Sequence, residues 1–166
     1  MLERERHENR LAGIRTLEAR LSFRFAVLQR MLDRQMGRIL ARHGLSLAAY
    51  RVLVTIDAFG ELAAADLVRL VAVDKALVSR SCADLVASGL IEARPDPSSG
   101  RRKLLRLTDA GGAALAATGP EADARNAGLD ALFTADERAA LEEALDRLTR
   151  HAARSLDSDA ALQPAA

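Results

Sequence analysis

The sequence has few aromatic residues and a single cysteine. Its 166 residues include no tryptophan, one tyrosine and four phenylalanines, so the core of the folded chain must be mostly aliphatic. One cysteine excludes an internal disulfide framework and fits a reducing cytosol. No apolar run approaches the roughly 20 residues that a membrane span needs. The N-terminal stretch MLERERHENR is charged from residue 3, unlike a secretory signal, so we expect a cytoplasmic protein with no membrane partner.

Charge of both signs is present but unevenly distributed, although the formal net charge is only +1. Residues 1–42 carry ten arginines against five acidic residues, and residues 62–108 carry eight basic residues against five acidic ones. Residues 109–166 carry five arginines against eleven acidic residues. The basic N-terminal and middle parts suggest an anionic partner, whereas the acidic part is interpreted as solvated helix surface.

Hydrophobic periodicity and capping residues predict several helices in the first half of the chain. Ser46 and Asp74 are placed to N-cap two of them, because short polar side chains there accept hydrogen bonds from free backbone N–H groups. Gly44, Gly60 and Gly89 are placed to end helices. We expect these helices at about residues 3–42, 47–59, 63–70 and 75–88.

The second half begins with a predicted β-hairpin. The stretches GLIEAR and RKLLRLT have strand character and flank a turn rich in proline, serine and glycine. Thr108 is placed to N-cap the following helix, in which Gly119-Pro120 should cause a kink or an interruption. Thr134 and Glu137 form a capping-box pattern for a last helix that ends near Leu156. The tail DSDAALQPAA is expected to be disordered.

The order of helices followed by a hairpin predicts a winged helix-turn-helix. The expected fold class is therefore mostly α with a small β-hairpin wing. The helix after the tight connection would lie in the DNA major groove, and the hairpin would reach the neighbouring backbone or the minor groove. A turn that carries several arginines makes a narrow cationic finger, which the minor groove attracts electrostatically.

The helix KALVSRSCADLVAS separates into two faces at about 100° per residue. Val78, Cys82 and Leu85 share the side that should pack inward, with Ser81 near its edge. The opposite side holds small residues that allow close approach, and Arg80, which pairs with a guanine edge or a phosphate. Free N–H groups in the first turn also favour a phosphate. We predict DNA contacts from Lys75, Ala76, Ser79, Arg80, Arg101 and Arg102.

Two stretches resemble the MarR (multiple antibiotic resistance regulator) family of bacterial transcription factors. GLSLAAYRVLVTI is similar to the family's second-helix segment. VDKALVSRSCADLVASGLIEARPDPSSGRRKLLRLTDAG is similar to its recognition helix and wing, including the closing L-T-x-x-G at Leu107, Thr108 and Gly111. The resemblance extends over about residues 20–150, and the joint match is more specific than any single piece.

The resemblance implies a homodimeric regulator that binds a palindromic operator and is expected to be a repressor. It also implies that a small effector, which could be an anion, releases the protein from DNA. It also implies that Arg101 is the wing arginine of the family's D-x-R pattern, in which Ser99 here replaces the aspartate. Either Asp96 substitutes for that acid or the turn stays mobile until DNA binds. The implied parts are 1–45 and 109–156 for dimerisation, 46–108 for DNA binding and 157–166 as a disordered tail.

Several residues have two interpretations. Cys82 lies on the inner face, so a small buried apolar residue is favoured over a redox sensor. Arg30, Arg34, Arg38 and Arg42 form an i, i+4 stripe that is either a solvated face or an anchor for an anionic effector. Other candidates for effector binding are Arg24, Tyr50 and Arg51. The histidines lack metal-ligand spacing, so we expect no metal site and no cofactor.

Other functions remain as alternatives to a ligand-responsive DNA-binding regulator. The winged fold also suits a protein-interaction module without specific DNA binding, which the loss of the family aspartate at Ser99 favours slightly. An enzyme is not expected, because the sequence has no nucleophile motif, phosphate-binding glycine loop or paired carboxylates on a core element. A repressor that needs no small molecule is a further option.

Overall fold

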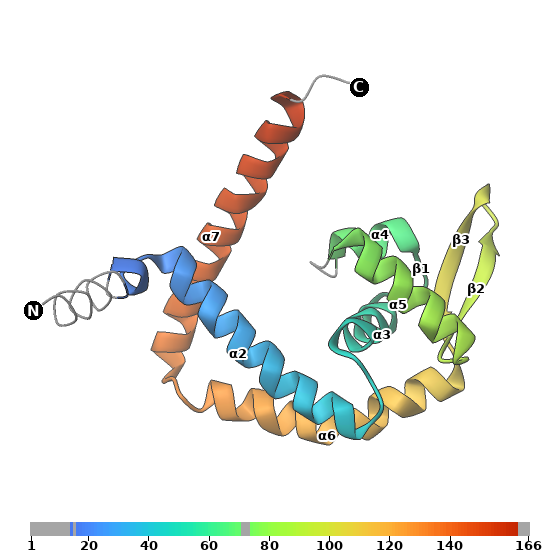
Figure 1. The fold of residues 1–166 in the computed structure, drawn as a ribbon, viewed down its shortest axis with the longest axis horizontal. Coiled ribbons are helices and arrows are strands. Elements are labelled where there is room, and N and C mark those ends of the chain that lie inside the picture. Colours follow the sequence, from blue (N-terminus) through green and yellow to red (C-terminus); the bar gives the residue numbers. More distant parts are fainter. Residues whose placement is uncertain (1–13, 15, 71–73, 163–166) are drawn as a thin grey trace, which may run out of the picture. The chain divides into compact units, whose positions relative to one another are not determined.

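A computed structural model describes residues 14, 16–70 and 74–162 of the chain, which form a mostly helical fold with one small sheet (Figure 1). The chain divides into two compact units, Met1–Ala122 and Asp123–Ala166. The expected fold class is confirmed. The helices are α2 (Leu21–Arg42), α3 (Leu47–Phe59), α4 (Ala64–Leu70), α5 (Lys75–Ala87), α6 (Asp109–Asp130) and α7 (Ala135–Leu162). The strands are β1 (Leu62–Ala63), β2 (Ile91–Asp96) and β3 (Ser99–Leu107).

The predicted N-caps are confirmed. Each depends only on neighbouring residues, which is why the sequence alone could predict it. The Ser46 side chain accepts a hydrogen bond from the backbone N–H of Ala49 at the start of α3. At the start of α7, the Thr134 N–H donates to the Glu137 carboxylate at 2.9 Å, and the Glu137 N–H donates back to Thr134 Oγ1 at 3.3 Å. These contacts satisfy N–H groups that a helix leaves free.

The first helix is not continuous as predicted. Residues 16–18 are helical, but Ala19 is in a turn and Arg20 has an extended backbone with φ −85° and ψ 122°. The Arg20 N–H donates to the carbonyl of Leu17, three residues earlier, and α2 restarts at Leu21. Neither Ala19 nor Arg20 is a helix breaker, so the sequence pattern gave no warning. The predicted residues 3–13 lie outside the described residues.

Three other expectations differ from the structure. Helix α6 continues through Pro120, so Gly119-Pro120 does not interrupt it, while the alternative expectation of a kink stays a prediction. Helix α7 continues to Leu162, where a disordered tail was expected from residue 157; residues 163–166 lie outside the described part. The two-residue strand β1 was not predicted, because its stability comes from pairing with β3 rather than from local sequence.

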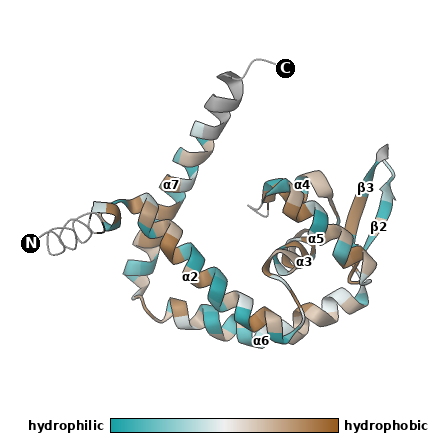
Figure 2. Ribbon diagram, in the orientation of Figure 1, coloured by the Kyte–Doolittle hydropathy of each residue, from teal (hydrophilic) through white to brown (hydrophobic). Residues whose placement is uncertain are grey.

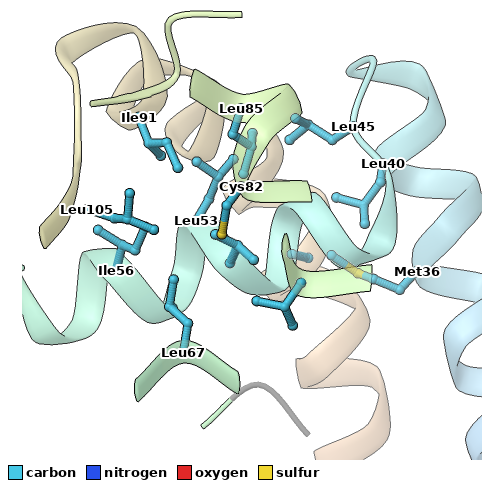
Figure 3. Close-up of a cluster of buried hydrophobic side chains, with 13 residues drawn as sticks. Met36, Leu40, Leu45, Leu53, Ile56, Leu67, Cys82, Leu85, Ile91 and Leu105 are labelled. Carbon is cyan, nitrogen blue, oxygen red and sulfur yellow. The ribbon is translucent and has the colours of Figure 1, made fainter. Parts of the chain in front are cut away.

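The core of the first unit is aliphatic, as the composition requires. Figure 3 shows Leu40 of α2, Leu53 of α3 and Leu85 of α5 directed toward one cluster, in which these three side chains are 0–3% exposed. The cluster contains Met36, Leu40, Leu45, Val52, Leu53, Ile56, Leu67, Val78, Cys82, Leu85, Ile91, Leu105 and Ala122. It fixes α5 against α3 and thereby determines which face of α5 remains exposed.

The sheet is antiparallel, in the order β1-β3-β2. Strands β2 and β3 form the predicted hairpin around a turn at residues 97–98. β1 pairs with β3 only at Leu104 and Leu105, close to the base of the hairpin. The pairing of β2 with β3 has a register shift between Pro95 and Asp96. The outer half of the hairpin is therefore two-stranded.

Thr108 connects the hairpin to α6. Its hydroxyl donates to the carbonyls of Gly89, at 2.7 Å, and Leu90, at 3.1 Å, and accepts from the N–H of Gly111 at 3.1 Å. The predicted N-cap is therefore confirmed. Gly111 is buried against Leu90, which explains why a glycine stands three residues after the threonine.

The described residues bear on two expectations from composition. No single described helix is long and apolar enough to cross a membrane; α2 and α3 pass that test only as a pair, which is bent by 85°. No group of three or more His, Cys, Asp or Glu side chains that could hold a metal ion occurs among these residues.

Candidate nucleic-acid interface

Helices α4 and α5 are the two helices of the predicted helix-turn-helix. The connection at residues 71–73 lies outside the described residues. Asp74 is the N-cap of α5, and its Oδ1 accepts from the N–H groups of Ala76 at 2.9 Å and Leu77 at 3.2 Å. α5 packs against α3, α4 and β2, so its position relative to the hairpin is fixed by the core (Figure 1).

The two predicted faces of α5 are confirmed. Val78, Ser81, Cys82 and Leu85 are buried, and Ser81 lies within the buried face rather than at its edge. Lys75, Ala76, Ser79 and Arg80 are all exposed. Alanine and serine beside the long arginine side chain leave room for a groove floor to approach the helix backbone.

The first turn of α5 offers fewer free N–H groups than expected. Two of them donate to the Asp74 carboxylate, and that carboxylate adds a negative charge at the helix N-terminus. Anion binding at a helix N-terminus depends on free N–H groups and a positive local potential. The sequence-based expectation of a phosphate held there by backbone N–H groups is therefore weakened.

The positively charged side chains of α5, by contrast, are not neutralised by any residue that the structure describes. Neither Lys75 nor Arg80 forms an ion pair with any residue that the structure describes. The same holds for the exposed Arg69 on α4. The helix-turn-helix thus presents three cations that are available to an anionic partner.

The positive charge at the base of the hairpin is partly neutralised by one carboxylate. Glu92 of β2 forms ion pairs with Arg94 at 2.9 Å and with Arg106 of the paired strand β3. Its hydrogen bond with Arg106, reinforced by both positive charges, holds the pKa of the Glu92 carboxyl below its ordinary value. Two of the arginines that make the sequence of this hairpin so basic therefore already have a carboxylate partner.

The outer hairpin has a second carboxylate, Asp96, whose side chain is 8% exposed. Its Oδ1 accepts from the Ser98 hydroxyl at 2.6 Å and from the Ser98 N–H at 2.8 Å. These bonds, and the nearby charge of Arg102, hold the pKa of Asp96 below its ordinary value. Arg102 lies 3.7 Å from Asp96 through Nε and 3.1 Å from Asp66 of α4 through Nη2. Asp96 thus fixes the turn and contacts Arg102.

Arg101 is in β3, but its side chain lies outside the part that the structure describes. The neighbouring Lys103 is exposed and has no ion-pair partner among the described residues. Sequence reasoning did not select Lys103 as a candidate, nor Asp66 and Glu92 as partners of arginines. Glu92 faces Arg106 directly in the strand register, so a register prediction would have found that pair.

Cys82 is 7% exposed, which agrees with the inward position predicted for it. Burial raises the pKa of its thiol. A reactive sensor thiol needs the opposite combination of exposure and a lowered pKa. The geometry therefore supports the interpretation as a small core residue.

The three residues considered for effector binding have different surroundings. Arg24 lines an open groove of about 580 Å³ together with Glu18, Phe23, Val27, Leu28 and Met31. Tyr50 packs against the core cluster, and Arg51 donates to Asp33 Oδ1 at 2.7 Å. Neither Tyr50 nor Arg51 is among the residues that line the groove.

The arginine stripe on α2 is mostly solvated. Arg30, Arg34 and Arg38 are exposed, whereas Arg42 pairs with Glu121 of α6. Glu121 also lies 2.9 Å from the ring of His43, so it connects the end of α2 to α6.

Comparisons with known proteins agree with this geometry. A sequence profile described as MarR family matches residues 43–102. A mutant MarR from E. coli complexed with operator DNA is 26% identical, with a TM-score of 0.70 over 77% of this chain and 92% of that one. The PcaV transcriptional regulator from Streptomyces coelicolor, in complex with its natural ligand, is 25% identical, with a TM-score of 0.67 over 82% and 96%.

A MarR family transcriptional regulator from Silicibacter pomeroyi has the same fold, with a TM-score of 0.72 at 23% identity over 81% of this chain and 90% of that one. No curated protein matches the chain. The profile covers α3, both helices of the helix-turn-helix, β2 and the start of β3, which are the elements that form the candidate interface. Members of this family are transcription regulators rather than enzymes. In its DNA-binding elements and in its fold, the chain is therefore similar to the MarR family of winged helix-turn-helix transcription regulators.

Proposed function

We propose that the protein is a homodimeric, sequence-specific DNA-binding repressor that a small effector releases from a palindromic operator. One observation carries the DNA-binding part. The exposed face of α5 combines small side chains with Lys75 and Arg80, which have no ion-pair partner among the described residues, and it lies beside a basic hairpin. The E. coli relative in complex with operator DNA supports the same use of the fold.

In this proposal α5 lies in the major groove. Ala76 and Ser79 permit close approach, Arg80 contacts a guanine edge or a phosphate, and Lys75 contacts a phosphate. Arg101 and Lys103 of β3 are placed in sequence to contact the backbone or the minor groove beside it.

The proposal of a dimer rests on apolar side chains that a monomer would leave in water. The N-terminal end of α2, largely brown in Figure 2, exposes Leu21, Phe23, Phe25, Leu28 and Met31 by 37–60%. In the second unit, Leu141, Leu145 and Leu148 of α7 are 39–43% exposed at helical spacing. Exposed large apolar side chains on one helix mark an interaction site, and a two-fold partner of the same chain is the simplest occupant.

Release by an effector is proposed from a ligand-bound relative and from a groove on α2. The PcaV structure with its natural ligand supports ligand response in a similar chain. The groove beside Arg24 offers apolar walls from Phe23, Val27, Leu28 and Met31, with one base, Arg24, and one acid, Glu18, so it suits a small amphipathic molecule. A ligand releases DNA only if it binds better to dimer geometries whose two recognition helices no longer match successive major grooves.

The test is fluorescence anisotropy with a DNA fragment from upstream of the protein's own coding region, at several salt concentrations. We expect an affinity that falls steeply with salt, because phosphate contacts release counterions. Arg80→Ala and Arg101→Ala should each weaken binding by about 1–3 kcal/mol if they contact bases.

Arg147→Ala is the matched control, since it removes the same charge from an exposed arginine of α7. It should change the affinity little. If neither the upstream fragment nor pooled genomic fragments bind above the non-specific level, the DNA-binding proposal fails, and the interaction-module alternative becomes the one to pursue.

A further inference from the structure

We infer that Arg102 is a positioning residue, which bridges Asp66 of α4 and Asp96 of β2 and so holds the outer half of the hairpin in place for DNA. This inference rests on the proposed DNA-binding function. It assigns to Arg102 a different role from the direct contact that the sequence suggested, and it gives a role to Asp66.

The outer half of the hairpin needs such support. β1 pairs with β3 only at Leu104 and Leu105, and in the described register only Ser99 and Lys103 of the outer part of β3 pair with β2. The register shift between Pro95 and Asp96 disturbs even that pairing. A two-stranded hairpin without further packing is only marginally stable in water.

Helix α4 begins where β1 ends, and this brings its first turn beside the outer part of β3. Ala63 pairs with Leu104, and the chain enters α4 at the next residue. Asp66 is in the first turn of α4, and Arg102 is two residues from Leu104 toward the turn. The Arg102 Nη2 to Asp66 Oδ2 distance of 3.1 Å is therefore a link between the helix-turn-helix and the outer hairpin.

The guanidinium contacts the two carboxylates through different nitrogens. Nη2 lies on Asp66, and Nε lies 3.7 Å from Asp96 Oδ2. Asp96 is itself fixed by two hydrogen bonds from Ser98 in the turn. The planar guanidinium of Arg102 thus links α4 to the turn of the hairpin. A lysine ammonium cannot contact the two carboxylates through two separate nitrogens in this way.

Two nearby carboxylates also offset the charge of Arg102, which leaves it little net attraction for phosphate. Arg102 instead affects DNA binding by raising the fraction of molecules in which the hairpin has the position that DNA contact requires. Exposed ion pairs shift such equilibria by up to about fivefold. With two hairpins engaged by one dimer, the loss of the bridge should weaken binding by roughly tenfold.

The experiment compares wild type, Asp66→Asn, Arg102→Lys and the double variant. The probe is a duplex that the wild-type protein selects from a random pool. We expect each single variant to bind about tenfold more weakly at an unchanged salt slope, and the double variant to lose no more than either. Asp57→Asn is the control: it removes an exposed acid from α3 that has no ion pair among the described residues, so the affinity for DNA should stay equal or rise.

The decisive variant is Asp66→Asn. If Arg102 acted only as a positive charge that attracts DNA, removal of the neighbouring Asp66 carboxylate would strengthen DNA binding. That result would overturn the inference, and so would additive losses of affinity in the double variant. Amide hydrogen exchange gives a second readout without DNA: residues 99–103 should exchange faster in Asp66→Asn, while the α3 core stays protected. Unchanged exchange there would also overturn it. A wild type that selects no DNA would count against the proposed function, and the exchange result would still decide the role of Arg102.

Discussion

The carbonyl oxygen of Leu90 lies 2.0 Å from the position that a β-carbon on Gly111 would occupy. Real β-carbons do not approach a backbone oxygen so closely, so α6 can start against the hairpin only because residue 111 has no side chain. The Thr108 hydroxyl holds the same junction by donating to Leu90 and accepting from Gly111. The L-T-x-x-G pattern is therefore a packing motif at the junction of wing and helix.

Gly111→Ala should destabilise the protein by about 1–3 kcal/mol, because the added methyl group must displace the backbone of Leu90 or the start of α6. Gly112→Ala is the matched control. A β-carbon there meets nothing within 4 Å, so the change should stabilise α6 by about 0.5–1 kcal/mol. Urea unfolding at fixed protein concentration measures both. Equal effects of the two substitutions would show that the close contact is not significant.

Asp74→Ala should cost about 0.5–2 kcal/mol of unfolding free energy, since two N–H groups of α5 lose their acceptor. Asp74→Ser keeps an acceptor in the same place and should lose less. The comparison again uses urea unfolding, with α5 helicity followed by hydrogen exchange. If both substitutions are neutral, solvent replaces the cap without cost and the predicted role of Asp74 is wrong.

Local features of this fold could be predicted from the sequence, and features set by register could not. Ser46, Asp74 and Thr134 cap helices through residues two or three positions away, so spacing alone was sufficient. The exposed face of α5 followed from helical periodicity in the same way. The two-residue strand β1 and the break at Arg20 have no comparable local signal.

The candidate interface was predicted in outline but not in its charge balance. The basic hairpin was recognised, yet Glu92 neutralises Arg106 from the facing strand, and Asp66 reaches Arg102 from a helix far earlier in the chain. Such pairs depend on strand register and on the packing of α4, which composition does not reveal.

Glu92 should make stability depend on acidic pH. Because Arg106 and Arg94 hold its pKa below the ordinary value in the folded state, its stabilising contribution is present above the unfolded-state pKa and is lost as the pH falls through the folded-state value. Between about pH 5 and pH 2, Glu92→Gln should therefore show a shallower loss of unfolding free energy than wild type. Parallel pH profiles for the two proteins would contradict the assignment.

Cys82 should react slowly in the native protein. Burial and a raised pKa leave little accessible thiolate at neutral pH, so a thiol reagent such as DTNB should modify the native chain far more slowly than the urea-unfolded chain. The measurement is the absorbance time course at about pH 7.5 in both states. Equally fast modification of the native protein would revive the sensor interpretation.

The most direct test of the central claim is selection of DNA from a random pool by the wild-type protein. A homodimer that inserts two α5 helices into successive major grooves should enrich an inverted repeat whose half-site centres lie about one helical turn apart, roughly 10 base pairs. A pool that shows no enriched sequence, or one unrepeated motif without two-fold symmetry, would contradict the account.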